Sequence, residues 1–103
     1  MSVLLEFSMF PTDKGASVSK YVSKVIAMIR DSGFSYKLTA MGTIIETETV
    51  SEALSIVARA AETLQKDSER IYSSIELDVR KGKSGRLSGK IKSIEEKIGN
   101  VST

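Results

Sequence analysis

The sequence contains no cysteine and no histidine among its 103 residues. Without cysteine, the chain can form no disulfide, no thiolate metal site and no cysteine nucleophile, and such a composition is typical of the reducing cytoplasm. Without histidine, it lacks the commonest general base, the commonest zinc ligand and any serine–histidine triad. No Walker sequence and no dinucleotide fingerprint is present either. We therefore expect a cytoplasmic protein that is not an enzyme, with no catalytic residues, no metal ligands and no cofactor.

The chain also lacks a strong excess of charge and a long hydrophobic run. Its formal net charge is +2 with 27% charged residues, which gives no electrostatic argument for nucleic acid as a partner. The opening stretch MSVLLEFSMF has no basic leader, and its apolar run is too short for a signal peptide or a membrane span. A chain of this length is expected to fold as one domain, residues 1–103, without needing disulfides or a structural metal.

The spacing of apolar residues changes in an orderly way along the chain. Alternation of apolar and polar residues predicts strands over residues 2–10, 35–40, 43–48 and 70–80. Helical spacing predicts a first helix that Ser17 caps and Gly33 ends, and a last one over about residues 87–98. Between them, Thr49 and Glu52 form a capping box. The core stripe expected for that middle helix is Val50, Leu54, Val57, Ala61 and Leu64.

This order of elements predicts an α+β, ferredoxin-like β-α-β-β-α-β fold with an added C-terminal helix. Two strand–helix–strand units joined by a hairpin give one antiparallel four-stranded sheet with both main helices on the same face. The opposite face is then uncovered by those helices. Such a face must be polar or must be buried against another subunit.

Residue parity places several carboxylates on that uncovered face. The residues expected to point towards the helices are Val3, Leu5, Phe7, Ile45, Ile71, Ile75 and Leu77. Glu6, Glu46 and Glu76 then point away from the helices, on three adjacent strands. Like charges on neighbouring strands cost stability unless something compensates them. The acids could be solvated, pair with basic residues of a neighbouring subunit, or recognise a cation. No acidic spacing resembles a calcium loop, and the acids disfavour RNA.

A glycine-rich basic segment, KGKSGRLSGK, covers residues 81–90. It could hold a phosphate group, although a loop with several lysines and glycines is more often solvated.

Three segments carry a resemblance to a known family: FSMFPTDKGASVSKYV, AMGTIIETE and RIYSSIELDVRKG. In this order and at these separations, they resemble the small thiamine-binding protein family, over nearly the whole chain. The resemblance implies a ferredoxin-like subunit that forms a dimer or tetramer. It also implies binding of a small cationic ligand, thiamine or its hydroxymethylpyrimidine part, at a cleft between subunits, for sensing, buffering or delivery.

The resemblance further implies where the ligand would be bound. Its residues are Met41, Gly42, Thr43 and Glu46, with Ser17, Ser19 and Tyr21 as pocket or interface neighbours; parity adds Glu6. In this hypothesis Glu46 supplies charge, Thr43 a polar handle, and Tyr21 or Tyr72 an aromatic wall. Two alternatives remain open: a regulatory module of the amino-acid-binding ACT type, and a structural oligomer whose acids form ion pairs across subunits.

Overall fold

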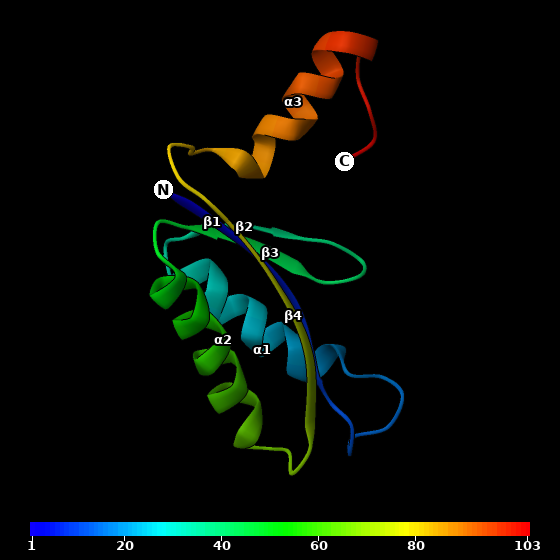
Figure 1. Cartoon of the computed structure of the whole chain (residues 1–103). Helices are drawn as coiled ribbons and strands as arrows, with labels where there is room; N and C mark the ends of the chain where they lie inside the picture. The colour runs from blue at the N-terminus through cyan, green and yellow to red at the C-terminus, as the bar shows by residue number, and fades with distance from the viewer.

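The computed structural model describes residues 1–103 and has four strands and three helices. Their bounds are β1 Ser2–Pro11, α1 Ser19–Asp31, β2 Ser35–Leu38, β3 Thr43–Thr47, α2 Val50–Gln65, β4 Ile71–Arg80 and α3 Arg86–Ile98. The strands form one antiparallel sheet in the order β2-β3-β1-β4. Helices α1 and α2 lie together against one face, and α3 projects beyond one end of the sheet (Figure 1). The predicted fold class and element order are confirmed. None of the helices is both long and apolar enough to span a membrane.

Alternation along β1 builds the core. Its odd-numbered residues from Val3 to Met9 are buried, and Leu5 lies opposite Ile45 of β3. Helix α1 contributes Val25 and Ile29 to this core from the side of the helices. Burying each large aliphatic side chain contributes about 1.5–3 kcal/mol. Residues of the opposite parity in β1 are thereby directed to the uncovered face, as predicted.

The buried face of α2 agrees only in part with the predicted stripe: Leu64 is buried, and Val50, Val57 and Ala61 are partly buried against the core. Leu54, expected in the core, is 43% exposed, and the buried residues are Ala53, Ile56, Ala60 and Leu64. The most buried face is therefore turned by about one position, which places the small side chains of Ala53 and Ala60 in the core. The predicted capping box of Thr49 and Glu52 is confirmed, with bonds in both directions.

The start of α1 was also predicted wrongly. The helix begins at Ser19, its N-cap is Val18, and no side chain caps it. Ser17 is exposed and lies ahead of the cap. At the other end, Gly33 follows the C-cap with a φ of 85°, a left-handed conformation that glycine adopts without strain.

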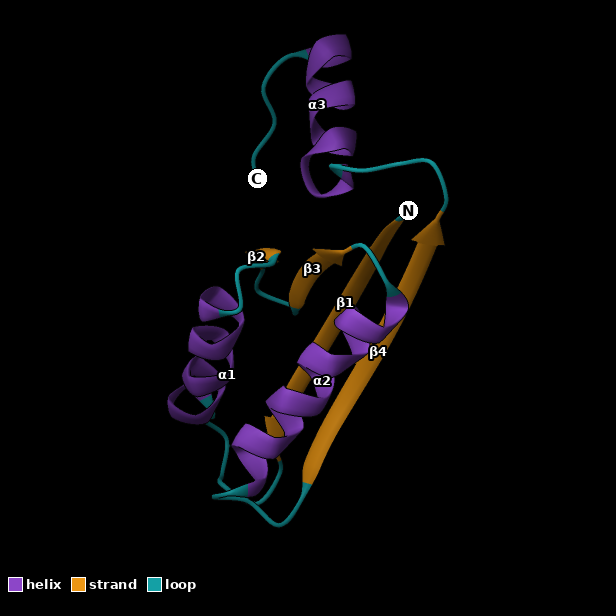
Figure 2. Cartoon of the chain, turned by 90° about the vertical axis from the view of Figure 1, so that its left-hand side faces the viewer, coloured by secondary structure: helices purple, strands orange, loops and turns teal.

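Strand β4 forms a free edge of the sheet. Ile75 and Leu77 lie opposite Phe7 and Leu5 and so face the helix side as predicted, but Leu77 is 43% exposed. Figure 2 shows β4 as a long strand that runs past α2. Because α2 packs mainly over β1, the apolar residues of the edge strand remain partly uncovered.

Candidate functional site

Glu46 lies on β3, where its carboxylate reaches the start of α3. It accepts a hydrogen bond from the Ser2 hydroxyl. The backbone N–H groups of Arg86 and Leu87 also donate to it, both at 3.0 Å. Those two amides belong to the first turn of α3 and would otherwise have no partner inside the helix. Gly85, the N-cap, has no side chain to bind them. Glu46 therefore caps a helix that follows it by 40 positions in the sequence.

These contacts also determine the charge of Glu46. Burial raises the pKa of the carboxyl, but the hydrogen bonds from Ser2, Arg86 and Leu87 and the positive charge of Arg86 outweigh it, so the pKa lies below its ordinary value. The group is therefore ionised at neutral pH. Both carboxylate oxygens have partners within the chain. The ligand role predicted for Glu46 stays a prediction beside this structural one.

Arg86 fastens the same helix to two strands. Its guanidinium donates to the hydroxyl and carbonyl of Ser2 at 3.0 and 2.8 Å and to the Asp78 carbonyl at 2.7 Å. It also pairs with the Asp78 carboxylate at 3.1 Å, with its own side chain only 12% exposed. Sequence reasoning missed this role, because nothing in the basic segment distinguishes Arg86 from its solvated neighbours.

Met41 and Gly42 lie in the turn between β2 and β3, and Thr43 is the first residue of β3. The Thr39 hydroxyl accepts from the backbone N–H groups of Met41 and Gly42 and donates to the Gly42 carbonyl at 2.9 Å. A Cβ at Gly42 would lie 2.9 Å from the Phe7 carbonyl oxygen. The turn can therefore lie against β1 only because this residue has no side chain.

Beside this turn is an apolar groove of about 400 Å³, which we call the α1 groove. It is lined by residues 7–10 and 38–43 and, from α1 and its cap, Val18, Val22, Val25 and Ile26. The groove opens because pairing of β1 with β3 stops at Phe7 and Thr43, so residues 8–10 pair only with β4. That side of β1 has backbone groups available to a ligand. Three predicted site residues, Met41 to Thr43, thus come together here.

The other predicted residues do not all join them. Glu6 lies near the turn, since its Cγ would be 3.8 Å from a Cβ at Gly42. Ser17 and Ser19 are exposed on either side of Val18. Glu46 does not line the α1 groove; it borders shallow pockets next to α3.

Tyr21, predicted as an aromatic wall for the ligand, is surrounded by lysines. The ammonium groups of Lys14, Lys20 and Lys24 each lie about 6 Å from its ring centroid. These charges would repel a cationic ligand, so the ring is poorly suited as a wall for thiazolium. Tyr72 is better placed: it is exposed on the uncovered face, and its ring centroid lies 6.0 Å from that of Phe10, which lines the α1 groove.

The uncovered face also carries the predicted acids. Glu6 and Glu76 are direct cross-strand partners on β1 and β4, and neither forms an ion pair. Nowhere do three or more acidic side chains gather closely enough to hold a metal ion. The face therefore offers negative charge next to an aromatic pair.

Comparison with known proteins identifies the family. The family model described as "Thiamine-binding protein" matches residues 5–95. The chain belongs to the thiamine-binding protein family. Within it, a UPF0045 protein of Methanocaldococcus jannaschii is 38% identical over 94 residues, covering 91% of this chain and 93% of that one. A UPF0045 protein of Mycobacterium tuberculosis is 35% identical over 95 residues, covering 92% and 93%. The resemblance seen in the sequence is confirmed.

Solved structures agree with the fold of the thiamine-binding protein family. A crystal structure of the M. jannaschii protein has a TM-score of 0.81 at 38% identity and covers 92% of this chain and 97% of that one. A Thermotoga maritima protein described as a candidate for thiamine biosynthesis or salvage has a TM-score of 0.79. At 17% identity, over 91% of this chain and 99% of that one, it supports the fold alone.

Proposed function

We propose that this protein binds thiamine or its hydroxymethylpyrimidine part in the α1 groove and performs no chemistry on it. The observation that carries the proposal is membership of the thiamine-binding protein family over residues 5–95. The groove is large enough for an aromatic ring system and has mostly apolar walls. The role would be to sense, buffer or deliver the compound.

The two rings of thiamine suit different parts of this region. The aminopyrimidine can lie between Val22 and Met41, where the free side of β1 residues 8–10 supplies hydrogen-bonding groups. The thiazolium cation would then lie towards the uncovered face, near the Glu6 carboxylate and the aromatic rings of Phe10 and Tyr72. Met41, which is 86% exposed, can move to cover the ligand.

Calorimetric titration with thiamine and with hydroxymethylpyrimidine tests this arrangement. We expect Glu6→Gln to weaken thiamine binding about three- to tenfold, because one carboxylate no longer faces the thiazolium charge. The affinity for hydroxymethylpyrimidine should be unchanged, since that part carries no thiazolium. Glu62→Gln is the matched control: it removes the same charge from an exposed position on α2 that does not line the groove.

Two results would count against it. Absence of any thiamine signal at millimolar ligand would refute thiamine binding itself. Retained binding in Glu6→Gln together with lost binding in Glu46→Gln would move the site from the α1 groove to the region next to α3.

We also propose that the chain self-associates through the free edge of β4. Ile75, Leu77 and Val79 form an exposed apolar row along this edge strand, whose outer backbone groups have no partner. Pairing of two β4 edges would bury that row and satisfy those groups. Ile94 and Ile98 of α3 are exposed as well and could add to the contact.

Leu77→Lys should shift the protein from dimer or tetramer towards monomer, because two ammonium groups would be brought into the apolar contact. Light scattering coupled to size-exclusion chromatography measures the mass. The control is Leu38→Lys, which adds the same charge to an exposed leucine of β2, the strand at the opposite edge. An unsubstituted protein that is already monomeric at high concentration would contradict self-association, and dissociation by Leu38→Lys alone would place the contact at β2.

A further inference from the structure

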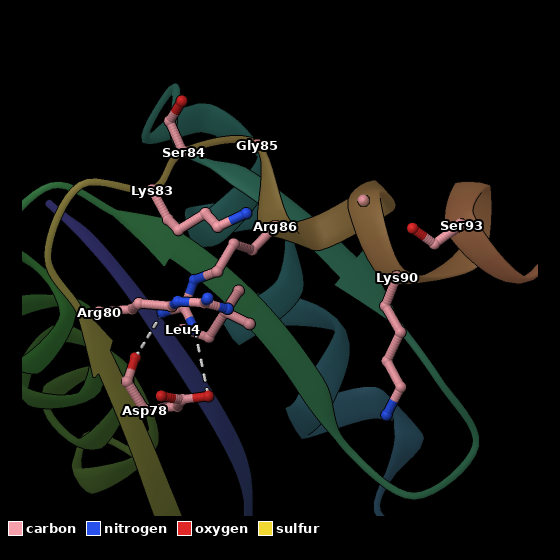
Figure 3. Close-up of a pocket in the computed structure, with 10 residues that line it drawn as sticks. Leu4, Asp78, Arg80, Lys83, Ser84, Gly85, Arg86, Lys90 and Ser93 are labelled. Atoms are coloured by element: carbon pink, nitrogen blue, oxygen red, sulfur yellow. Dashed lines mark hydrogen bonds and ion pairs between the residues drawn. The ribbon is translucent and has the colours of Figure 1, made fainter.

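A second pocket lies between the end of β4 and the first turns of α3. Its volume is about 440 Å³, and Leu4 is the one hydrophobic residue among the ten that line it. Figure 3 shows its side chains: Arg80, Lys83 and Arg86 gather near the end of β4 in this view, and Lys90 extends from α3 away from them. We call it the basic pocket. It shares no residue with the α1 groove.

The charge of the basic pocket is strongly one-sided. Four cationic side chains line it, against the single carboxylate of Asp78. Arg86 and Asp78 neutralise each other in an ion pair, whereas Arg80, Lys83 and Lys90 form no ion pair at all. These three exposed cations line one concave surface and give it a positive potential that attracts anions. The Glu46 carboxylate, bound to the helix amides next to the pocket, offsets only part of that charge.

The rest of the lining leaves room for hydrogen-bonded oxygen atoms. Gly85 has a φ of 62°, which turns the chain sharply into α3, and a Cβ at Gly89 would meet nothing within 4 Å. Ser84 and Ser93 bring hydroxyl groups. The helix amides of α3 are already bound to Glu46, so the pocket depends on its side chains rather than on the helix N-terminus.

We propose that the basic pocket binds a small molecule through a phosphate or pyrophosphate group. A guanidinium fork, two ammonium groups and hydroxyl donors are the groups that recognise phosphate oxygens. Thiamine itself is a cation and is excluded by the same charges, so this inference goes beyond the proposed function. A nucleic acid strand fits less well, because the neighbouring uncovered face carries Glu6 and Glu76 instead of a continuing basic surface.

The test is titration of the full chain with inorganic pyrophosphate, without thiamine and in a phosphate-free buffer. The double variant Lys83→Gln/Lys90→Gln should weaken binding at least tenfold, because it removes two of the three unpaired charges. These residues lie outside the Glu46–Arg86 contacts, so the helix should stay attached. The control Lys66→Gln/Lys97→Gln changes the net charge equally at exposed positions that do not line the pocket and should alter binding less than twofold.

Three results would overturn the proposal: no pyrophosphate binding at millimolar concentration, equal weakening in the two double variants, or binding of a single-stranded RNA oligonucleotide but not pyrophosphate. Because thiamine is absent from these titrations, their failure leaves the proposed function of the α1 groove untouched. Binding of pyrophosphate without binding of thiamine would support the basic pocket as a phosphate site and refute the proposed function of the α1 groove.

Discussion

Replacing Glu46 by glutamine is expected to lower the free energy of unfolding by about 2 kcal/mol. The charge-assisted hydrogen bonds are lost, and the NH2 group of glutamine would face partners that are themselves donors. The two N–H groups at the start of α3 and the Ser2 hydroxyl would compete for one neutral carbonyl oxygen. Urea unfolding measures the loss, and amide hydrogen exchange in α3 shows whether the helix is released. Glu96→Gln, an exposed position on α3 with no hydrogen-bond partner, is the control and should change little.

The same contact predicts how stability depends on pH. The folded-state pKa of Glu46 lies below the ordinary value of 4.5. Its contribution is therefore fully present above pH 4.5 and is lost as the pH falls through the lowered folded value. The stability difference between the unsubstituted protein and Glu46→Gln should shrink over that acid range. A difference that is absent at neutral pH would contradict the capping role.

Gly42→Ala is expected to destabilise the protein by about 1–3 kcal/mol, because overpacking forces the neighbouring backbone to move. A Cβ here would lie 2.9 Å from the Phe7 carbonyl oxygen, which is main chain and cannot rotate away. The turn would be displaced from β1, so thiamine affinity should fall as the α1 groove changes shape. Thermal unfolding and the thiamine titration measure the two effects.

Gly89→Ala is the matched control for that substitution. It adds the same methyl group within α3, where nothing lies within 4 Å of the new atom. Since alanine favours a helix over glycine by about 1 kcal/mol, this variant should be as stable as the unsubstituted protein or more so. Equal stability of Gly42→Ala and Gly89→Ala would show that the close approach at Phe7 is not a constraint.

The sequence predicts the sheet and the direction of Glu46 because both depend on local alternation. Once β1 buries its odd-numbered residues, parity directs Glu6 and Glu46 to the other face. The partner of Glu46 could not be predicted in the same way. Its contact with Arg86 joins residues 40 positions apart and depends on where a separate helix begins, which no periodicity records.

Helix α2 shows a different limit. Two apolar stripes run along it, one through Ala53 and Ile56 and the other through Leu54 and Val57. Hydrophobicity favours the leucine stripe, but closeness to the sheet favours the alanines. Periodicity gives the helix and its approximate face, whereas the final rotation depends on the fit of side chains against β1.

The predicted site residues do not all lie together, because Glu46 does not line the groove that Met41 to Thr43 line. Met41 to Thr43 lie together at the α1 groove because they are consecutive in the chain. The surroundings of Tyr21 were not predicted because Lys14 reaches it from the loop before α1, beside Lys20 and Lys24 of the helix itself. Contacts between a loop and a helix face require the three-dimensional path of the loop.

The facing carboxylates of Glu6 and Glu76 give ionic strength opposite effects on two properties of the molecule. Dissolved salt screens their mutual repulsion and so relieves a strain in the sheet. The same salt screens the attraction between the basic pocket and an anion, and between Glu6 and a cation. Raising the salt concentration is therefore expected to relieve the repulsion within the sheet and, at the same time, to weaken the binding of charged ligands.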